Sequence, residues 1–124
     1  MIVKTCLLVS DDPDDHIEFS EALYEISNDI VVISVTHPKK ALDLLSMKKC
    51  RPDFIFVNLE MNGCSPDEFL TAIEKDHDLE NIRLIAFGEY GEYDKIKTRR
   101  ISCFMNNDIS FSELRNFLAK VINS

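Results

Sequence analysis

The chain has 124 residues, of which 45% are hydrophobic and 29% are charged, and its formal net charge is −8. This length favours one domain with a core of its own, whereas the excess of acids argues against a nucleic-acid partner. Because no apolar run approaches the roughly 20 residues of a membrane span and the N-terminus lacks the features of a secretory signal, we expect a cytoplasmic protein with no membrane partner.

Five apolar segments have the length and composition of β-strands. They are residues 3–9, 30–35, 54–58, 83–87 and 101–105. Three of them are apolar almost throughout instead of alternating between apolar and polar residues. Such continuous runs are typical of strands in a parallel sheet that is covered on both faces.

Helical periodicity replaces the strand pattern between these segments. Apolar side chains recur at positions i, i+3, i+4 and i+7, which places them on one face of a helix. The clearest examples are Phe19, Ala22, Leu23 and Ile26 in the first helix and Leu114, Phe117, Leu118 and Val121 in the last. The sequence therefore predicts amphipathic helices that pack against the sheet.

The starts of these helices carry capping residues. Asp12 and Ser65 each precede a proline, and Ser110 begins the pattern Ser-Phe-Ser-Glu of a capping box. A second helix is predicted over 38–48 and a fourth near 90–99. The fourth is the weakest of the set, because glycines flank its start and its apolar stripe is thin.

Strict alternation of strands and helices predicts an α/β fold of the flavodoxin-like kind, a doubly wound three-layer sandwich. Right-handed crossovers give its five-stranded parallel sheet the order 2-1-3-4-5. In such a sheet the functional crevice lies beyond the carboxyl ends of the strands, where the order reverses between strands 1 and 3. The candidate site therefore comprises residues 10–12, 58–60, 88–89 and 106–108.

The local sequence at these positions resembles the receiver domains of two-component response regulators, the CheY-like family. The matching segments are LLVSDDPDD (7–15), PDFIFVNLEMNGCSPDEFL (52–70), NIRLIAF (81–87) and FMNNDIS-x-x-EL (104–114). The resemblance covers essentially the whole chain. It implies a single receiver-like domain over 1–124, without an effector domain, that serves signalling and is not itself an enzyme.

The same resemblance places the family's phosphorylation site on residues that lack its chemistry. The phospho-acceptor aspartate falls on Asn58, and the two metal-binding acids fall on Ser10 and Asp11. The hydroxyl residue after strand 4 falls on Gly88, and the lysine after strand 5 falls on Asn107. The resemblance thus implies a degenerate receiver, or pseudo-receiver.

Each replacement removes one requirement of phosphoryl transfer. The carboxamide of Asn58 is neutral and a poor nucleophile. A hydroxyl and an amide in place of two carboxylates leave a weak site for Mg²⁺. Asn107 offers no fixed positive charge to the oxygens of a phosphoryl group. We therefore expect a module that acts by protein–protein interaction without phosphorylation and without a cofactor.

The acidic turn after the first strand leaves one alternative open. If Asp11 and Asp12 both faced the crevice, their carboxylates could still bind Mg²⁺. Glu60 stands at the loop position that, by the resemblance, provides a backbone carbonyl to the metal. The favoured interpretation is that Asp12 caps the first helix. Asp14 and Asp15 are then surface acids that complement the helix dipole.

The family's usual partner face comprises helix 4, strand 5 and helix 5. Phe104 falls on its switch aromatic, and this face also holds Tyr90, Tyr93, Lys97 and Arg99. The two tyrosines are either exposed anchors or half-buried residues beside the sheet edge. The expected partners are histidine kinases or other regulators, and self-association into a homodimer is the alternative output.

Two other functions stay open. A working phosphorelay receiver would need another acid, Asp11 or Glu60, as acceptor. A small-ligand site would use the uncharged groups of the crevice and the thiol of Cys64. Of the remaining reactive side chains, Cys6 and Cys103 are predicted in the core, and the histidines at 16, 37 and 77 are predicted to be solvated.

Overall fold

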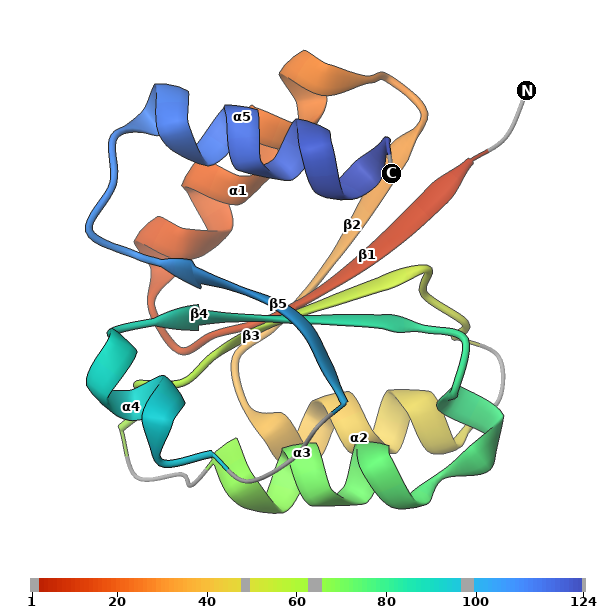
Figure 1. Cartoon of the computed structure of the whole chain (residues 1–124). Coiled ribbons are helices and arrows are strands. Elements are labelled where there is room, and N and C mark those ends of the chain that lie inside the picture. Colours follow the sequence, from red (N-terminus) through yellow and green to blue (C-terminus); the bar gives the residue numbers. More distant parts are fainter. Residues whose placement is uncertain (1–2, 48–49, 63–65, 97–99, 124) are drawn as a thin grey trace.

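A computed structural model describes residues 3–47, 50–62, 66–96 and 100–123. Five parallel strands form one sheet in the order β2-β1-β3-β4-β5, as Figure 1 shows, which confirms the predicted topology. The strands are β1 (Lys4–Val9), β2 (Ile30–Val35), β3 (Phe54–Asn58), β4 (Arg83–Gly88) and β5 (Ile101–Asn106). Each begins and ends within one residue of the predicted bounds.

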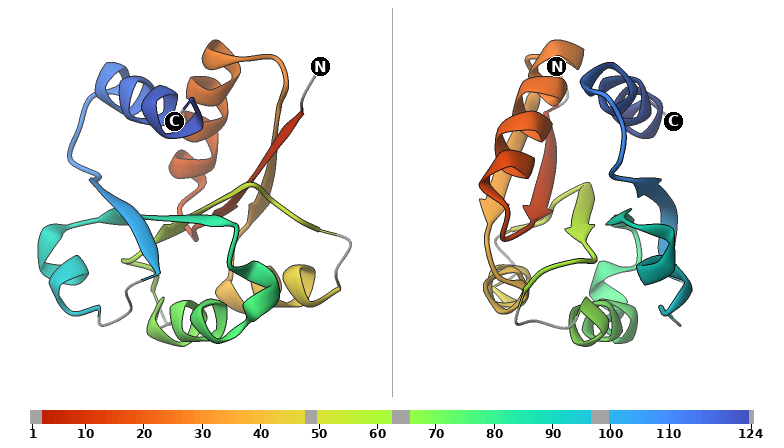
Figure 2. Two further views of the ribbon diagram at one scale, coloured as in Figure 1. Left: turned by 45° about the vertical axis from the view of Figure 1, so that its right-hand side comes forward. Right: turned by 90° about the vertical axis from the view of Figure 1, so that its left-hand side faces the viewer.

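Helices cover both faces of this sheet. They are α1 (Pro13–Ile26), α2 (Pro38–Ser46), α3 (Pro66–Lys75), α4 (Tyr90–Asp94) and α5 (Phe111–Ile122), with a short 3₁₀ turn at His77–Leu79. Helices α1 and α5 lie together on one face, and α2 and α3 lie on the other (Figures 1 and 2). The predicted three-layer sandwich is therefore confirmed.

The extent predicted for the fourth helix is wrong. Instead of covering 90–99, α4 ends at Asp94 after five residues. The helix contains Gly91, which is a poor helix former, and none of its side chains is fully buried. Little packing is therefore available to extend it.

Two of the predicted caps begin helices in the structure. The carboxylate of Asp12 accepts a hydrogen bond from the Asp14 backbone N–H at 3.0 Å, with Pro13 at the first helical position. Ser110 and Glu113 form the reciprocal capping box, with contacts of 3.1 and 3.2 Å. The cap predicted at Ser65 lies outside the described residues.

The core is divided by the sheet into two layers. On β1, Leu7 and Val9 face α2 and α3, whereas Cys6 and Leu8 face α1 and α5. Every residue of β3 (Phe54–Asn58) is buried. The central strands are continuously apolar because both of their faces are covered.

Three cysteines lie among the described residues. Cys6 is fully buried, as predicted, and burial raises the pKa of its thiol to about 12. Cys103 is half-buried and packs against the layer formed by α1 and α5. Cys50 is also half-buried, whereas Cys64 lies outside the described residues.

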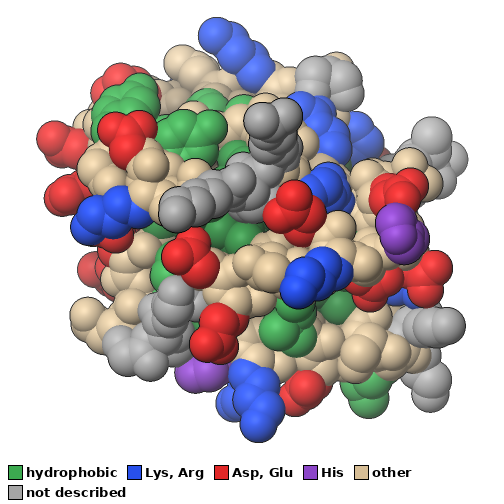
Figure 3. Space-filling view, turned by 60° about the horizontal axis from the view of Figure 1, so that its bottom comes forward, with side chains coloured by type: hydrophobic (Ala, Val, Ile, Leu, Met, Phe, Trp, Pro, Cys, Tyr) green, Lys and Arg blue, Asp and Glu red, His purple; other side chains and the backbone are tan. Residues whose placement is uncertain are grey.

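The surface carries charges of both signs. On the face drawn in Figure 3, Lys and Arg side chains are interspersed with Asp and Glu side chains. Within the part of the chain that the structure describes, no helix combines the length and the apolar character that crossing a bilayer requires.

Candidate functional site

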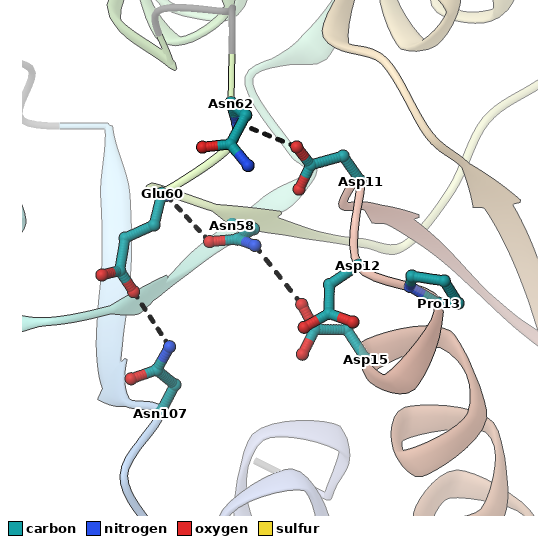
Figure 4. A pocket seen from close by; sticks show the side chains of 8 residues that line it. All are labelled: Asp11, Asp12, Pro13, Asp15, Asn58, Glu60, Asn62 and Asn107. Atoms are coloured by element: carbon teal, nitrogen blue, oxygen red, sulfur yellow. Dashed lines mark hydrogen bonds between the residues drawn. The ribbon is translucent and has the colours of Figure 1, made fainter.

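The carboxyl ends of the central strands surround an open pocket of about 430 Å³. Because β1, β3 and β5 are parallel, the loops that follow them meet at one edge of the sheet. The lining residues are Asp11, Asp12, Pro13, Asp15, Asn58, Glu60, Asn62 and Asn107 (Figure 4). Asn58 and Asn107, from the ends of two different strands, thus line the same pocket.

Asn58 lies at the end of β3 and is held on both sides of its carboxamide. Its Nδ2 donates to Ser10 Oγ at 3.2 Å and to Asp15 Oδ2 at 3.3 Å. Its Oδ1 accepts a hydrogen bond from the Glu60 backbone N–H at 2.8 Å. The side chain is 6% exposed, so these bonds supply the partners that a buried amide needs. A carboxylate at this position could not make the two donated bonds.

Ser10 is completely buried and joins the first strand to Asn58. Its hydroxyl donates to Asp15 Oδ2 at 2.6 Å and accepts from the Asp12 backbone N–H at 3.1 Å. A carboxylate in place of this hydroxyl would stand beside the Asp15 carboxylate. The short serine therefore allows Asp15 to approach the end of β1.

The prediction that Asp15 is a surface acid is wrong. Asp15 lies in the first turn of α1, which begins directly after the acidic turn, and its half-buried carboxylate points into the pocket (Figure 4). Burial raises the pKa of Asp15, the hydrogen bond from Ser10 lowers it, and the charges of Asp12 and Glu18 raise it further. The net shift is upward.

His16 is also misplaced by the sequence prediction, because it is half-buried instead of solvated. Its Nε2 lies 2.8 Å from the backbone oxygen of Ser10. Since a carbonyl oxygen only accepts, Nε2 is the donor. The other ring nitrogen, Nδ1, is buried without a hydrogen-bond partner among the described residues. The start of α1 is thus fixed to the end of β1 by two consecutive side chains. His37 and His77 are exposed, as predicted.

Asp11, Asp12 and Glu60, the three residues considered for a metal site, all line the pocket. The carboxylate of each already accepts a hydrogen bond from an N–H group. Asp11 Oδ2 accepts from the Asn62 backbone N–H at 2.8 Å. Asp12 caps α1, and Glu60 Oε2 accepts from Asn107 Nδ2 at 2.9 Å. Over the described ranges, no three His, Cys, Asp or Glu side chains are arranged to hold a metal ion.

Gly88 ends β4 with a backbone φ of +149°, which favours glycine. A Cβ placed there would stand 3.3 Å from Glu60 Oε2 and 3.4 Å from Leu59 Cβ. The side chain of Glu60 therefore uses the space that a hydroxyl residue would need, and it then meets Asn107. One arrangement thus joins Gly88, Glu60 and Asn107.

The pocket is strongly acidic. Among the described residues, its lining includes four carboxylates and no Lys, Arg or His. Like charges in a partly enclosed site repel an anionic phosphoryl group more strongly than they would in open water. Positions 58 and 107 add only neutral amides to this acidic lining.

An aromatic cluster lies at the far edge of the sheet, on the predicted partner face. Phe104 of β5 stacks on Tyr93 with ring centroids 4.4 Å apart and contacts Tyr90 at 5.1 Å. Tyr93 is half-buried, whereas Tyr90 is 61% exposed. Tyr93 is thus the half-buried residue of one interpretation, whereas Tyr90 is exposed and its role as an anchor stays a prediction. Lys97 and Arg99 lie outside the described residues.

Sequence reasoning missed three members of the site. Asp15 and His16 belong to the helix that Pro13 starts, and Asn62 contributes its backbone N–H. The position of Pro13 was a usable signal, because it fixes which residues form the first turn over the crevice. The contact of Asn62 is made by its backbone N–H, which does not depend on residue type, so the sequence carries no signal for it.

Comparison with known proteins identifies the fold. No family model and no curated protein matches the sequence. The phosphorylated cyanobacterial phytochrome response regulator RcpA has 21% sequence identity and a TM-score of 0.80, over 97% of this chain and 91% of that one.

Two other solved structures are similar. Chemotaxis response regulator CheY4 of Vibrio cholerae has 17% identity and a TM-score of 0.76, over 97% of this chain and 99% of that one. The Mn²⁺-bound form of response regulator Rcp1 has 19% identity and a TM-score of 0.76, over 95% and 91% of the two chains. The chain therefore has the fold of CheY-like receiver domains.

Proposed function

We propose that this chain is a receiver-like signalling module, a single domain over 1–124, that acts through protein–protein contacts without being phosphorylated. Receiver domains are signalling domains and not enzymes, and the fold places this chain among their structural relatives. The observation that carries the proposal is the Asn58 carboxamide, bonded to Ser10, Asp15 and the backbone of Glu60. These contacts engage both the donor and the acceptor of the amide.

The chemistry of the crevice supports this proposal. Transfer of a phosphoryl group to a receiver needs an oxygen nucleophile and positive charge near the phosphoryl oxygens. Position 58 presents an amide to the pocket, and the Asn107 amide is bonded to the Glu60 carboxylate at 2.9 Å. Both requirements are therefore missing from the positions where the receiver fold provides them.

A relay that uses another acid receives less support. Asp11 accepts the Asn62 backbone N–H at 2.8 Å, so it would have to leave this contact to attack a phosphoryl donor. Glu60 is held by Asn107 and lies against Gly88. Within the part of the chain that the structure describes, no cationic side chain lines the pocket beside either carboxylate. A small-ligand function receives no specific support from the polar, open pocket.

The expected partners are histidine kinases or other regulators, which would contact the chain through its aromatic edge. Tyr90 is the exposed member of that edge and rests on Phe104. Exposed tyrosines with one packed face are frequent anchors of protein interfaces. In the proposed mechanism the contacts of Tyr90 and Tyr93 with Phe104 keep the aromatic edge in one conformation. Gly88 has no hydroxyl that could move toward a phosphoryl group, so phosphorylation would not rearrange this edge.

Intact-mass spectrometry tests the proposal. The protein is incubated with acetyl phosphate and Mg²⁺ beside a phosphorylation-competent receiver as a positive control. We expect the control to gain the mass of one phosphoryl group and this chain to keep its mass. A gain in mass that Asp11→Asn or Glu60→Gln abolishes would replace the proposal by the relay.

A further inference from the structure

Strand β2 (Ile30–Val35) forms one margin of the sheet. It pairs with β1 over six consecutive residues, from Lys4 opposite Ile30 to Val9 opposite Val35. The sheet order ends at β2, so β1 is its one neighbour in the sheet (Figure 2). Its other side therefore presents backbone groups that no strand of the sheet pairs with.

The backbone groups on that outer side can be identified. The carbonyl oxygens of Asp29 and Val35 accept hydrogen bonds from the backbone N–H groups of Lys4 in β1 and of Ser10 directly after it, at 2.9 and 3.1 Å. In a strand, successive residues direct their N–H and C=O groups to opposite sides. Ile30, Val32 and Ser34 therefore direct both of their backbone groups outward.

This edge lacks the usual protection against pairing. Edge strands commonly carry a charged residue, a proline or a bulge. β2 has the sequence IVVISV, its register with β1 is unbroken, and no Asp, Glu, Lys or Arg occurs from 30 to 38. Val31 is 48% exposed and Ser34 is also exposed.

Helix α2 is too short to cover the strand beside it. Its nine residues span about 13 Å, whereas the six residues of β2 span roughly 20 Å. The start of β2 therefore extends beyond the helix, which accounts for the exposure of Val31.

We propose that a second copy of this chain pairs with β2 in antiparallel orientation, about a two-fold axis through Val32. Val32 then faces its own counterpart, and Ile30 faces Ser34 of the other copy. These are the residues with outward backbone groups, so each pair exchanges two hydrogen bonds. The two sheets join into one continuous sheet.

The uncharged edge suits a second copy as the occupant. Two chains of net charge −8 repel each other, and the uncharged stretch 30–38 is where they can approach without opposing carboxylates. In the proposed register the nearest acid, Asp29, faces Val35 of the other copy. The two Asp29 carboxylates then stand roughly 20 Å apart along the strands, beyond the Debye length of about 8 Å at physiological salt.

Sedimentation velocity from micromolar to near-millimolar protein tests this interface. We expect the mass to rise with concentration from 14.3 kDa toward twice that value, and the association to strengthen as salt is added. Ser34→Pro removes an outward N–H without removing a bond to β1, and Val31→Lys adds a charge to the edge. Each should weaken association at least tenfold. Ile17→Lys is the control: this side chain is 56% exposed on α1, and the change should leave association unaltered.

Hydrogen exchange decides whether an observed dimer uses β2. The N–H groups of Ile30, Val32 and Ser34 should exchange more slowly as dimer forms, while far-ultraviolet circular dichroism confirms that each variant is folded. A chain that stays monomeric, or a dimer without added protection at these residues, would overturn the proposal. So would association that salt weakens, because that result indicates an ion-paired interface.

Discussion

Asn58→Asp is the substitution whose outcome depends most directly on the geometry of the pocket. It puts a carboxylate in place of the amide whose Nδ2 lies 3.3 Å from Asp15 Oδ2. Two unit charges near 4 Å repel by about 1 kcal/mol in water and by about 4 kcal/mol at the lower effective dielectric of a protein surface. Because Asp15 is half-buried, we expect a loss of roughly 2 kcal/mol in the free energy of unfolding at pH 8.

The sign of the pH dependence follows from the raised pKa of Asp15. Burial and the neighbouring acids already favour its protonated form, and a second carboxylate raises the pKa of the pair further. The variant should therefore approach the parent in stability below the carboxylate pKa of the unfolded chain, about 4. The loss should develop as the pH rises through the higher folded pKa values.

Urea unfolding at pH 4 and pH 8, followed by circular dichroism, measures both quantities. Asp15→Asn in the Asn58→Asp background removes the repulsion, so we expect this double variant to recover most of the loss at pH 8. Asp14→Asn is the matched control, since this exposed acid in the same turn should recover little. A loss of stability that is independent of pH, or that Asp15→Asn does not relieve, would show that the two side chains do not face each other.

Three further substitutions and reactions probe other parts of the structure. Gly88→Thr should cost about 1–3 kcal/mol in unfolding free energy because of its positive φ and the contact with Glu60, whereas Gly91→Ala, with open space around it, should be neutral or stabilising. Cys6, with its pKa near 12, should resist thiol reagents at pH 8 until urea unfolds the chain. Lys4→Met should cost about 1 kcal/mol, because Lys4 Nζ donates to the Ile122 carbonyl at the end of α5.

The fold could be predicted from the sequence because several independent patterns agreed. The continuous apolar run 54–58 indicated a strand covered on both faces, and all five residues are buried. Phe19, Ala22 and Leu23 recur at helical spacing and are buried on α1. Asp12 was expected to cap that helix and does so. Local propensity, periodicity and capping each restrict the same element, so their agreement fixes it.

The interior of the site was less predictable. The segments after the strands located the amides at 58 and 107 in one pocket, since parallel strands end at one edge. Residue type could not show that Asp15 turns inward, because an acid in a first helical turn is equally favourable when solvated. Nothing in the sequence indicated that the side chain of Glu60 lies over Gly88, where the missing Cβ leaves room. Such packing depends on a neighbour from another strand.

The most direct test of the central claim, that this crevice cannot hold a phosphoryl group, is an NMR titration with beryllofluoride at constant Mg²⁺. Beryllofluoride mimics a phosphoryl group on an acceptor carboxylate. We predict that the backbone and side-chain amide signals of Asn58 and Asn107 stay in place as the reagent is added. A saturable shift of these signals, with Gly88 moving in parallel, would contradict the claim.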